Sequence, residues 1–461
     1  MKRCLLRNSF LTLSLACAIA TSLSAATTPQ SLSLEECIHI AIENATTVLK
    51  AQNAVTVSGA EVLRRYAQFL PDLQASANYD YSRGRTLLTL PSPTTVSTRN
   101  FGPSYQLSSS INIFNGYSDY ATMKAAIARK SANELSLSRA REQIAVDITQ
   151  AFLQVNLDAE LVTIARENVR VSLERQNLLT EQTRVGIKDL SDLYRQEAQT
   201  SSDEAALISI ENKLRDDTIQ LVRRLRLNTA QNYAFQKKTS DDKGSSLETL
   251  SEEALIAEAL QQRTDFQASQ KTLNAATWSI SSAQSSYYPK INFNANLAGL
   301  GRNVTKQFVN GVDLTPNQQT NLWVQSRENI LWDAGISLTW AIFDRQVTRY
   351  AVAQAAADKA NALIDLEDEK LQVISDVRQA VGDLSAAKRR LEATEKGIQA
   401  AEKAYETVFG RYQVGAASFL DLISAQSVLV DSRSAKAQAQ MDTLLQSRVL
   451  AHAVGIILLK N

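Results

Sequence analysis

The sequence has little cysteine, histidine and proline, and no excess of charge of either sign. Its 461 residues include 3 cysteines, 2 histidines and 7 prolines, with 49 basic against 48 acidic residues. This balance argues against a nucleic-acid-binding protein, which usually carries a basic face. His39 and His452 lie far apart, without the clustered ligands that a metal site needs. Nucleophile motifs, phosphate loops and dinucleotide fingerprints are also missing, so we expect neither a cofactor nor an enzyme.

The N-terminus has the features of a secretory signal. Lys2, Arg3 and Arg7 precede an apolar run over residues 10–20, and small residues at 24–26 offer a cleavage site. The run is too short to span a membrane as a helix. We therefore predict that the first 26 residues are a signal peptide and that the mature protein is exported.

Cleavage of the signal peptide would leave one cysteine in the mature chain. Cys4 and Cys17 would leave with the signal, so Cys37 has no partner for an intrachain disulfide. A lipid anchor on Cys17 is disfavoured, because Ser14-Leu15-Ala16 is a poor match to a lipoprotein signal. The mature chain also lacks a segment apolar enough for a transmembrane helix, which leaves the periplasm, the medium or an outer membrane crossed by strands.

The chain repeats itself once. Pro71 returns as Pro289 after 218 residues, and Phe114 returns as Phe343 after 229 residues. The second offset also relates two glycine turns, at 183–186 and 411–415. The difference of 11 residues places an insertion between Pro289 and Phe343, in the segment 303–329. Each half is thus expected to contain a helix, a proline, strands, a long helix, a glycine turn and a return helix.

These patterns give element boundaries. We predict a first repeat over 27–235, a linker over 236–249 and a second repeat over 250–461. The first repeat should contain a helix at 31–69, strands at 72–85 and 102–114, a long helix at 117–185 and a return helix at 190–228. The second should contain a helix at 251–286, strands at 290–302 and 330–343, a long helix at 345–413 and a return helix at 419–457.

The predicted strands alternate strictly between apolar and polar residues. One series is Leu73, Ala75, Ala77, Tyr79 and Tyr81, with polar residues between them. Such alternation indicates one apolar and one polar face. A β-sandwich would give the same pattern, but export and strands of about ten residues favour a transmembrane β-barrel. The segments 83–102 and 299–327, rich in Pro, Gly, Ser, Thr and Asn, are expected to be surface loops.

Four strands cannot close a barrel, and open sheet edges are not tolerated in lipid. Other copies of the chain must therefore complete it. Three copies would give 12 strands, which is within the range of about 8 to 26 for bacterial barrels. Two copies would give eight strands, with an interior filled by side chains.

The long helices are free of proline. At about 1.5 Å per residue, a continuous helix over 117–185 would reach about 100 Å. Apolar positions correspond across the repeat and lie along one stripe, so each helix needs neighbours along its length. The matched pairs are Ile144/Val373, Ile148/Val377, Phe152/Val381, Val155/Leu384, Val162/Leu391 and Val169/Ile398. The return segments would supply partners in antiparallel hairpins.

The second turn carries a recognisable pattern. Arg411-Tyr412-x-x-Gly415-x-x-Ser418-x-Leu420-Asp421-Leu422-Ile423-x-Ala425-Gln426 resembles the hairpin-tip signature of the TolC-like outer-membrane efflux and secretion channels. The Phe114-Asn115-Gly116 and Phe343-Asp344 segments and the two-fold repeat are similar too. Arg345 stands where a glycine is usual, and the proline often found after Asn44 is absent.

The resemblance implies a fold of mixed α and β structure. Four strands from each chain of a homotrimer would form a 12-stranded barrel in outer-membrane lipid, and long helical hairpins would form an α-barrel in the periplasm. The hairpin tips would close the entrance and dock onto a periplasmic adaptor protein linked to an inner-membrane transporter. The implied function is a passive exit duct for efflux or type I secretion.

The resemblance also assigns site residues. It places Asp421 and Ser424 at the pore constriction, where the family carries two acids. It assigns tip closure and adaptor docking to residues of both turns: Gly186, Ser191, Asp192, Arg411, Tyr412, Gly415 and Ser418. Pro71, Phe114, Pro289 and Phe343 mark the junctions between barrel and helices. The family's basic partner at the second tip falls on Ala417.

Other interpretations stay open at this point. Gly186 and Gly415 are explained structurally if they end helices with a positive φ, and Asp421 could simply be a favourable charge at a helix N-terminus. For the whole chain, the alternatives are a pore-less periplasmic coiled-coil adaptor or scaffold and a secreted enzyme. The alternating strands argue against the adaptor, and helices this thin leave no catalytic cleft.

Overall fold

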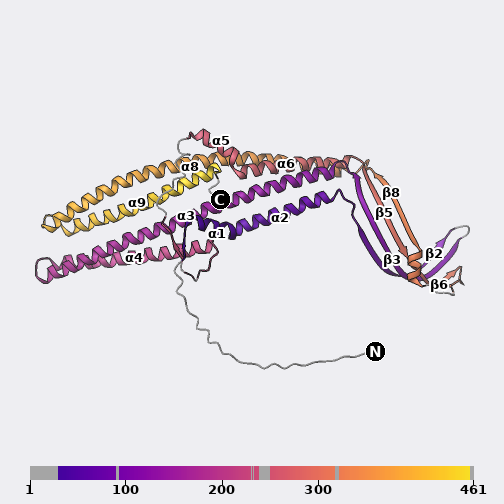
Figure 1. The fold of residues 1–461 in the computed structure, drawn as a ribbon, viewed down its shortest axis with the longest axis horizontal. Coiled ribbons are helices and arrows are strands. Elements are labelled where there is room, and N and C mark those ends of the chain that lie inside the picture. The colour runs from indigo at the N-terminus through magenta and orange to yellow at the C-terminus, as the bar shows by residue number, and fades with distance from the viewer. Residues whose placement is uncertain are drawn as a thin grey trace, which may run out of the picture.

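The computed structural model describes residues 30–89, 93–229, 231, 233–237, 250–316 and 321–456. The molecule is long and narrow, with helices over most of its length and a sheet at one end (Figure 1). The predicted signal peptide and most of the predicted linker lie outside the described residues. Among the helices described, none combines the length and the apolar character needed to cross a membrane.

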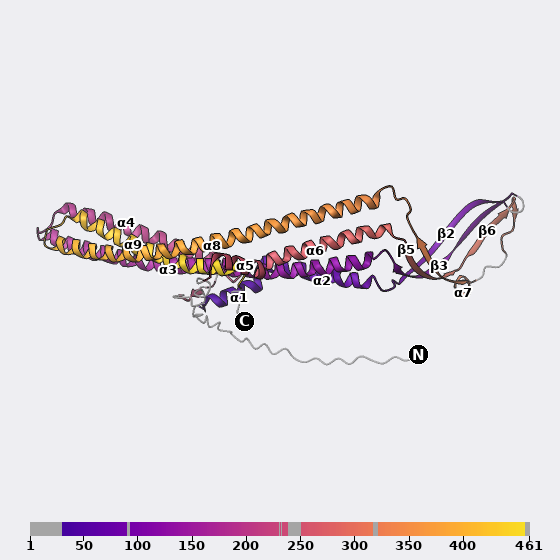
Figure 2. The ribbon, with the colours of Figure 1, turned by 90° about the horizontal axis from the view of Figure 1, so that it is seen from above.

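The helices form two long hairpins with shorter helices beside them. The first hairpin consists of α3 (Ser118–Arg184) and α4 (Leu190–Arg224), and the second of α8 (Val347–Gln413) and α9 (Phe419–Val454). Both turns lie at the end of the molecule opposite the sheet (Figures 1 and 2). The shorter helices are α1 (Leu34–Asn44), α2 (Thr46–Ala67), α5 (Glu252–Gln262) and α6 (Thr264–Gln284).

The helix expected at 31–69 is two helices, and so is the one expected at 251–286. The first breaks at Ala45, where ψ is 131°, even though the usual proline is absent. Arg226 donates a hydrogen bond to the Asn44 carbonyl (3.2 Å), and so satisfies an acceptor near the break. The second helix breaks in the same way at Arg263. A short parallel pair, β1 (Gln30–Leu32) and β4 (Tyr233–Phe235), packs with α1 in one apolar cluster.

The main sheet is antiparallel, and its strands follow the order of the helices. β2 (Gln74–Leu88), β3 (Thr94–Phe114), β5 (Lys290–Leu300) and β8 (Ile330–Thr339) pair in that order. α2 leads into β2 and β3 leads into α3, while α6 and α8 connect to β5 and β8 in the same manner. β2 and β8 are therefore the edges of a curved layer that begins in the helices and continues in the strands.

The prediction that the connecting segments 83–102 and 299–327 are surface loops was wrong. The segment 83–102 is mostly strand, because β2 and β3 stay paired from Gln74↔Ser108 to Leu88↔Thr94. The expected loop at 299–327 contains β6 (Asn303–Val309), β7 (Val312–Asp313) and the helix α7 (Leu322–Glu328). β6 pairs with the outer part of β3. The turn-forming composition of these segments concealed the cross-strand pairing, which depends on the partner strand rather than on local propensity.

The register gives the sheet one apolar and one polar face. Residues in direct register share a face. Leu107 pairs with Leu297, which pairs with Trp332, while Ser108 pairs with Asn296, which pairs with Asp333. The apolar face is open: Trp332 is 75% exposed and Ile336 is 70% exposed.

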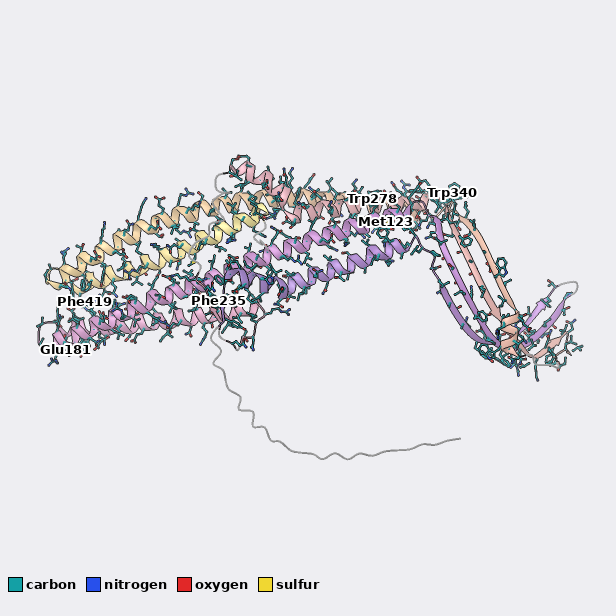
Figure 3. All side chains as sticks on the ribbon, in the orientation of Figure 1. Met123, Glu181, Phe235, Trp278, Trp340 and Phe419 are labelled. Atoms are coloured by element: carbon teal, nitrogen blue, oxygen red, sulfur yellow. The ribbon has the colours of Figure 1, made fainter. Side chains whose placement is uncertain are left out.

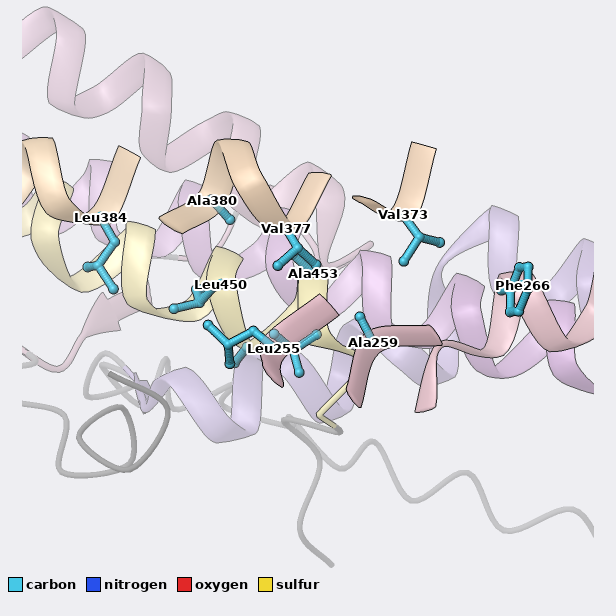
Figure 4. Close-up of a cluster of buried hydrophobic side chains, with 11 residues drawn as sticks. Leu255, Ala259, Phe266, Val373, Val377, Ala380, Leu384, Leu450 and Ala453 are labelled. Carbon is cyan, nitrogen blue, oxygen red and sulfur yellow. The ribbon is translucent and has the colours of Figure 1, made fainter. Parts of the chain in front are cut away.

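The buried core lies in the helical part, midway along the molecule. One cluster joins α5, α6, α8 and α9 and includes Leu255, Val373, Val377 and Leu450 (Figure 4). A second joins α1, α3 and α4 around Phe152 and Leu221. The predicted stripe is buried on α3 at Ile148, Phe152, Val155, Val162 and Val169, but on α8 it is fully buried only at Val373, Val377 and Leu384.

Candidate functional site: the paired hairpin tips

Each hairpin turns at a glycine with a left-handed backbone. φ is +79° at Gly186 and +75° at Gly415, and at both positions an added Cβ would meet open space. The Ile187 amide donates to the Gln182 carbonyl (2.8 Å), and the Ala416 amide donates to the Arg411 carbonyl (2.8 Å). These bonds close the last helical turn in the Schellman manner, for which glycine is suited because it has no Cβ. The structural role of both glycines is therefore fully accounted for.

The second turn ends in a reciprocal cap. The Asp421 amide donates to Ser418 Oγ (3.1 Å), and the Ser418 amide donates to Asp421 Oδ2 (3.0 Å). The hydrogen bonds from Ser418, together with the nearby Arg411, hold the pKa of the exposed Asp421 carboxyl below its ordinary value. Arg411 also donates to the Ala416 carbonyl (3.1 Å). Asp421 thus starts α9 as a capping box and stays charged at neutral pH.

The first turn is capped more simply. Asp189 accepts a hydrogen bond from the Ser191 amide (2.8 Å). Asp192, which matches Asp421 across the repeat, does not form a reciprocal box. Its N-cap partner is the carboxylate Asp189 rather than a hydroxyl, and two carboxylates repel. Ser191 and Ser424 are exposed, and Asp192 is partly buried.

The two tips pack against each other. Leu179 and Leu193 of the first hairpin contact Phe419 of the second, with Tyr412 beside them. Figure 3 shows Phe419 and Glu181 at this same end of the molecule. Lys188 lies over the Tyr412 ring, 4.3 Å from its centroid. The structure thus brings the two predicted turns together.

The environment of Tyr412 links it to the first hairpin. Burial raises the pKa of the phenol, and the nearby Asp192 carboxylate raises it further. The Tyr412 hydroxyl is buried, and no hydrogen-bond partner for it lies within the part of the chain that the structure describes. The cation next to Tyr412 is Lys188 of the first turn.

Sequence reasoning missed the contacts that hold the tips. Lys188 lies two residues after Gly186, and Phe419 lies between Ser418 and Leu420, but neither residue carried a signal of its own in the sequence. Behind the tip, Arg175 of α3 is only 8% exposed and donates to Gln426 of α9 and to the Tyr405 hydroxyl (3.2 Å). In the sequence, Arg175 resembles the many charged residues on the solvated faces of the long helices. Only the packing of α3, α8 and α9 shows that it is buried.

The predicted junction residues lie where strands meet helices. Pro289 directly precedes β5, and Pro71 lies three residues before the start of β2. Phe114 ends β3 with its ring edge-on to Tyr117 (centroids 5.4 Å apart). Phe343, at the matching place before α8, is 76% exposed. The nearby Trp340, labelled in Figure 3, donates a hydrogen bond to the Tyr287 carbonyl (3.1 Å).

Comparison with known proteins identifies the class of the molecule. The sequence profile described as "Outer membrane efflux protein" matches residues 37–225 and 255–456, one match for each repeat. The chain belongs to the outer membrane efflux protein family. Membership makes it an outer-membrane efflux channel and not an enzyme, with its long helices in the periplasm.

Solved structures share the fold at low sequence identity. The outer membrane protein VceC from Vibrio cholerae superposes with a TM-score of 0.75 at 18% identity, covering 92% of this chain and 96% of VceC. The CmeC outer membrane channel of Campylobacter jejuni gives 0.74 at 18% identity, covering 92% and 85%. The open-state MtrE channel of Neisseria gonorrhoeae gives 0.68 at 17% identity, covering 92% and 88%. Curated protein sequences gave no match.

Proposed function

We propose that three copies of this chain form a passive exit duct of a tripartite efflux pump or type I secretion system. In this proposal the strands form one 12-stranded barrel, and the hairpin tips close the periplasmic entrance. The tips also dock onto a periplasmic adaptor that leads to an inner-membrane transporter.

The observation that carries the proposal is a pair of complementary open edges. The edge strands β2 and β8 each pair on one side only. The helices joined to them expose apolar side chains along their length: Val57 (70%) and Leu63 (71%) on α2, and Ile364 (56%) and Leu371 (64%) on α8. Contact between α2–β2 of one copy and α8–β8 of the next would cover both edges. Such a head-to-tail contact generates a ring when the rotation between successive copies closes.

The strand number supports a ring of three copies, because two copies would give only eight strands, with an interior filled by side chains. Each chain supplies β2, β3, β5 and β8, so three chains give the even number of 12. In the ring, α8 would lie between α6 of its own chain and α2 of the next, as α3 lies between α2 and α6 within one chain. This equivalence accounts for the apolar residues that α8 leaves exposed.

Adaptor docking is supported by the apolar surface of the tips. Ile187 (71%) and Leu190 (50%) are exposed at the first turn, and Val414 (79%) and Leu420 (68%) at the second. Exposed apolar residues on a rigid turn are a usual place for partner binding. Lys188 and Tyr412 would then help to hold the tips closed until the adaptor engages them.

The pore role of Asp421 is compatible with its capping role. Its carboxylate is exposed and its pKa is lowered, so three copies would place three negative charges near the constriction. Confined negative charge attracts cations. Ser424, exposed one helical turn further on, would line the same opening.

Single-channel recording tests this proposal. The full-length protein in planar bilayers should conduct, and a trivalent cation such as hexamminecobalt added on the periplasmic side should block it. Asp421→Asn removes the charge but keeps an acceptor for Ser418, and should weaken the block at least tenfold. The matched control is Asp192→Asn at the first tip, which should have a smaller effect. Failure of the wild type to conduct would contradict the duct, and unchanged block in Asp421→Asn would contradict the constriction.

A further inference from the structure

Three basic side chains form a row across three adjacent strands. Arg83 of β2 pairs directly with Arg99 of β3, and Arg99 pairs directly with Lys306 of β6. Such partners point to the same face with Cβ atoms about 4.5–5.5 Å apart, so like charges there repel each other. The stability of the folded chain gives no reason for this arrangement.

The row continues the apolar face of the sheet. Tyr79 and Tyr81 precede Arg83 at two-residue intervals and therefore share its face. Phe101 lies on this face as well, because it pairs with Tyr81, and its ring is 6.2 Å from that of Tyr79. The order along the face is thus an apolar band, then aromatic rings, then the basic row.

The depth of the row matches a membrane surface. Ile113 to Phe101 spans 12 residues of β3, which is about 40 Å along the strand at ~3.3 Å per residue. With the usual barrel tilt of about 40°, this corresponds to roughly 30 Å across the membrane, the thickness of the hydrocarbon layer. Arg99 then falls at the head groups of the leaflet on the side opposite the long helices.

One acid, Asp313, balances only part of the charge of the three basic side chains. Among the residues that the structure describes, Arg83, Arg99 and Lys306 form no salt bridge, and the buried Nε of Arg99 has no hydrogen-bond partner. Asp313 is in register with Phe308, and hydrogen bonds from Thr315 together with the nearby Lys306 lower the pKa of its carboxyl. Its carboxylate accepts a hydrogen bond from the Thr315 amide (2.9 Å). Arg83 and Lys306 are exposed.

We propose that this basic row binds the phosphate groups of an anionic lipid in the outer leaflet of the outer membrane. Guanidinium groups bind phosphate oxygens in pairs, and a lysine adds a compact charge. Basic clusters at a membrane surface are the usual means of holding anionic head groups. The bound phosphate neutralises the repulsion along the row. The inference rests on the position of the sheet in the membrane, and it is independent of the pump partner.

The test measures lipid binding by the full-length assembled protein in neutral phospholipid nanodiscs. The probes are lipid A, a phosphorylated glycolipid, and the same lipid after enzymatic dephosphorylation. Wild-type protein should bind the phosphorylated form at least tenfold more tightly. The variant Arg83→Gln/Arg99→Gln/Lys306→Gln should lose this preference. Equal binding of both lipids by the wild type would overturn the proposal.

The control removes the same charges from α8. Arg349→Gln/Arg389→Gln/Lys403→Gln changes two arginines and one lysine that are exposed far from the row, and should keep the preference. If the triple row variant does not assemble, Lys306→Gln alone should still reduce the preference at least threefold. Displacement of lipid A by an equal concentration of inorganic phosphate would overturn the assignment to lipid. Wild-type conductance in a row variant that has lost lipid preference separates this inference from the proposed duct.

Discussion

The two repeats bend at the same place with different chemistry. α1 gives way to α2 at Ala45 (φ −61°, ψ 131°), and α5 gives way to α6 at Arg263 (φ −62°, ψ 121°). Both residues are buried, at 6% and 2% exposure. Ala45 packs with Val48 and Leu137 in a small apolar cluster. The backbone break therefore does not depend on the side chain that occupies it.

The helix break at Arg263 forms ion pairs, which the break at Ala45 lacks. Arg263 binds Asp265 (2.6 Å) and Asp376 of α8 (2.7 Å), and Arg139 of α3 also binds Asp265 (2.9 Å). This network ties the second repeat to the first, and it ties α6 to α8. The comparison teaches that duplicated backbones kept their geometry while one copy acquired the contacts between repeats.

The largest expected effect on stability comes from replacing Arg263 by alanine, the residue at the matching break of the first repeat. Arg263→Ala leaves Asp265 and Asp376 without their main partner, and removing one member of a buried ion pair costs about 3–5 kcal/mol. We expect that loss in the free energy of unfolding of the purified protein. The control is Arg378→Ala, which removes an exposed ion pair with Glu252 (2.9 Å) and should change little. Similar losses in both variants would refute a special role for Arg263.

A second test uses His452, which lies beside this network. Its match in the first repeat, Arg223, is exposed. Burial, together with Arg139 and Arg263, lowers the pKa of His452 from 6.5 to about 4. The unfolded chain binds the proton near pH 6.5 and the folded chain only near pH 4. The stability is therefore complete above about pH 6.5 and is lost as the pH falls toward 4, by about 3 kcal/mol per chain.

His452→Gln should flatten this pH dependence, as measured by unfolding at pH 7 and pH 4.5. Burial raises the pKa of Glu142, which has the opposite effect on stability in the same region. That contribution is present in both proteins and cancels in the comparison. An unchanged difference between the two pH values in His452→Gln would show that another group causes it.

The residues directly before the long helices α3 and α8 differ little in backbone conformation between the two repeats. Gly116 and Tyr117 have φ of +67° and +65°, and their matches Arg345 and Gln346 have +59° and +69°. The glycine is needed at the first site, because an added Cβ would lie 2.3 Å from the Ser285 carbonyl oxygen. At the second site an arginine takes the same left-handed conformation.

Exchange of these residues should have opposite effects. Gly116→Ala should lower the stability by more than the ~1–2 kcal/mol of the left-handed conformation alone, since the clash is added. Arg345→Gly should raise the stability by about 1 kcal/mol, because glycine relieves the same strain but loses more chain entropy. Both are measured as changes in the unfolding midpoint. A destabilised Arg345→Gly would indicate that the arginine side chain makes a contact of its own in the assembly.

Much of the fold was predictable because its signals are local. The glycine turns at Gly186 and Gly415 follow from the left-handed conformation that commonly ends a helix, and the alternation in β2, β3, β5 and β8 follows from the pleat. The outer parts of β2 and β3 were not predictable. Their residues favour turns, and only the pairing of Arg83 with Arg99 and its neighbours makes them strands.

The sequence by itself determined the repeat, the long helices, the two-faced strands and the tips, because each depends on spacing along one chain. The tertiary structure decided what those tips touch. Lys188 lies over the Tyr412 ring, and Phe419 packs against Leu193. Asp421 forms the capping box of α9. The tertiary structure also decided that Arg263 is buried in an ion-pair network and that basic residues align across three strands. These are contacts between residues far apart in sequence, and their energies depend on burial and register, which no local pattern records.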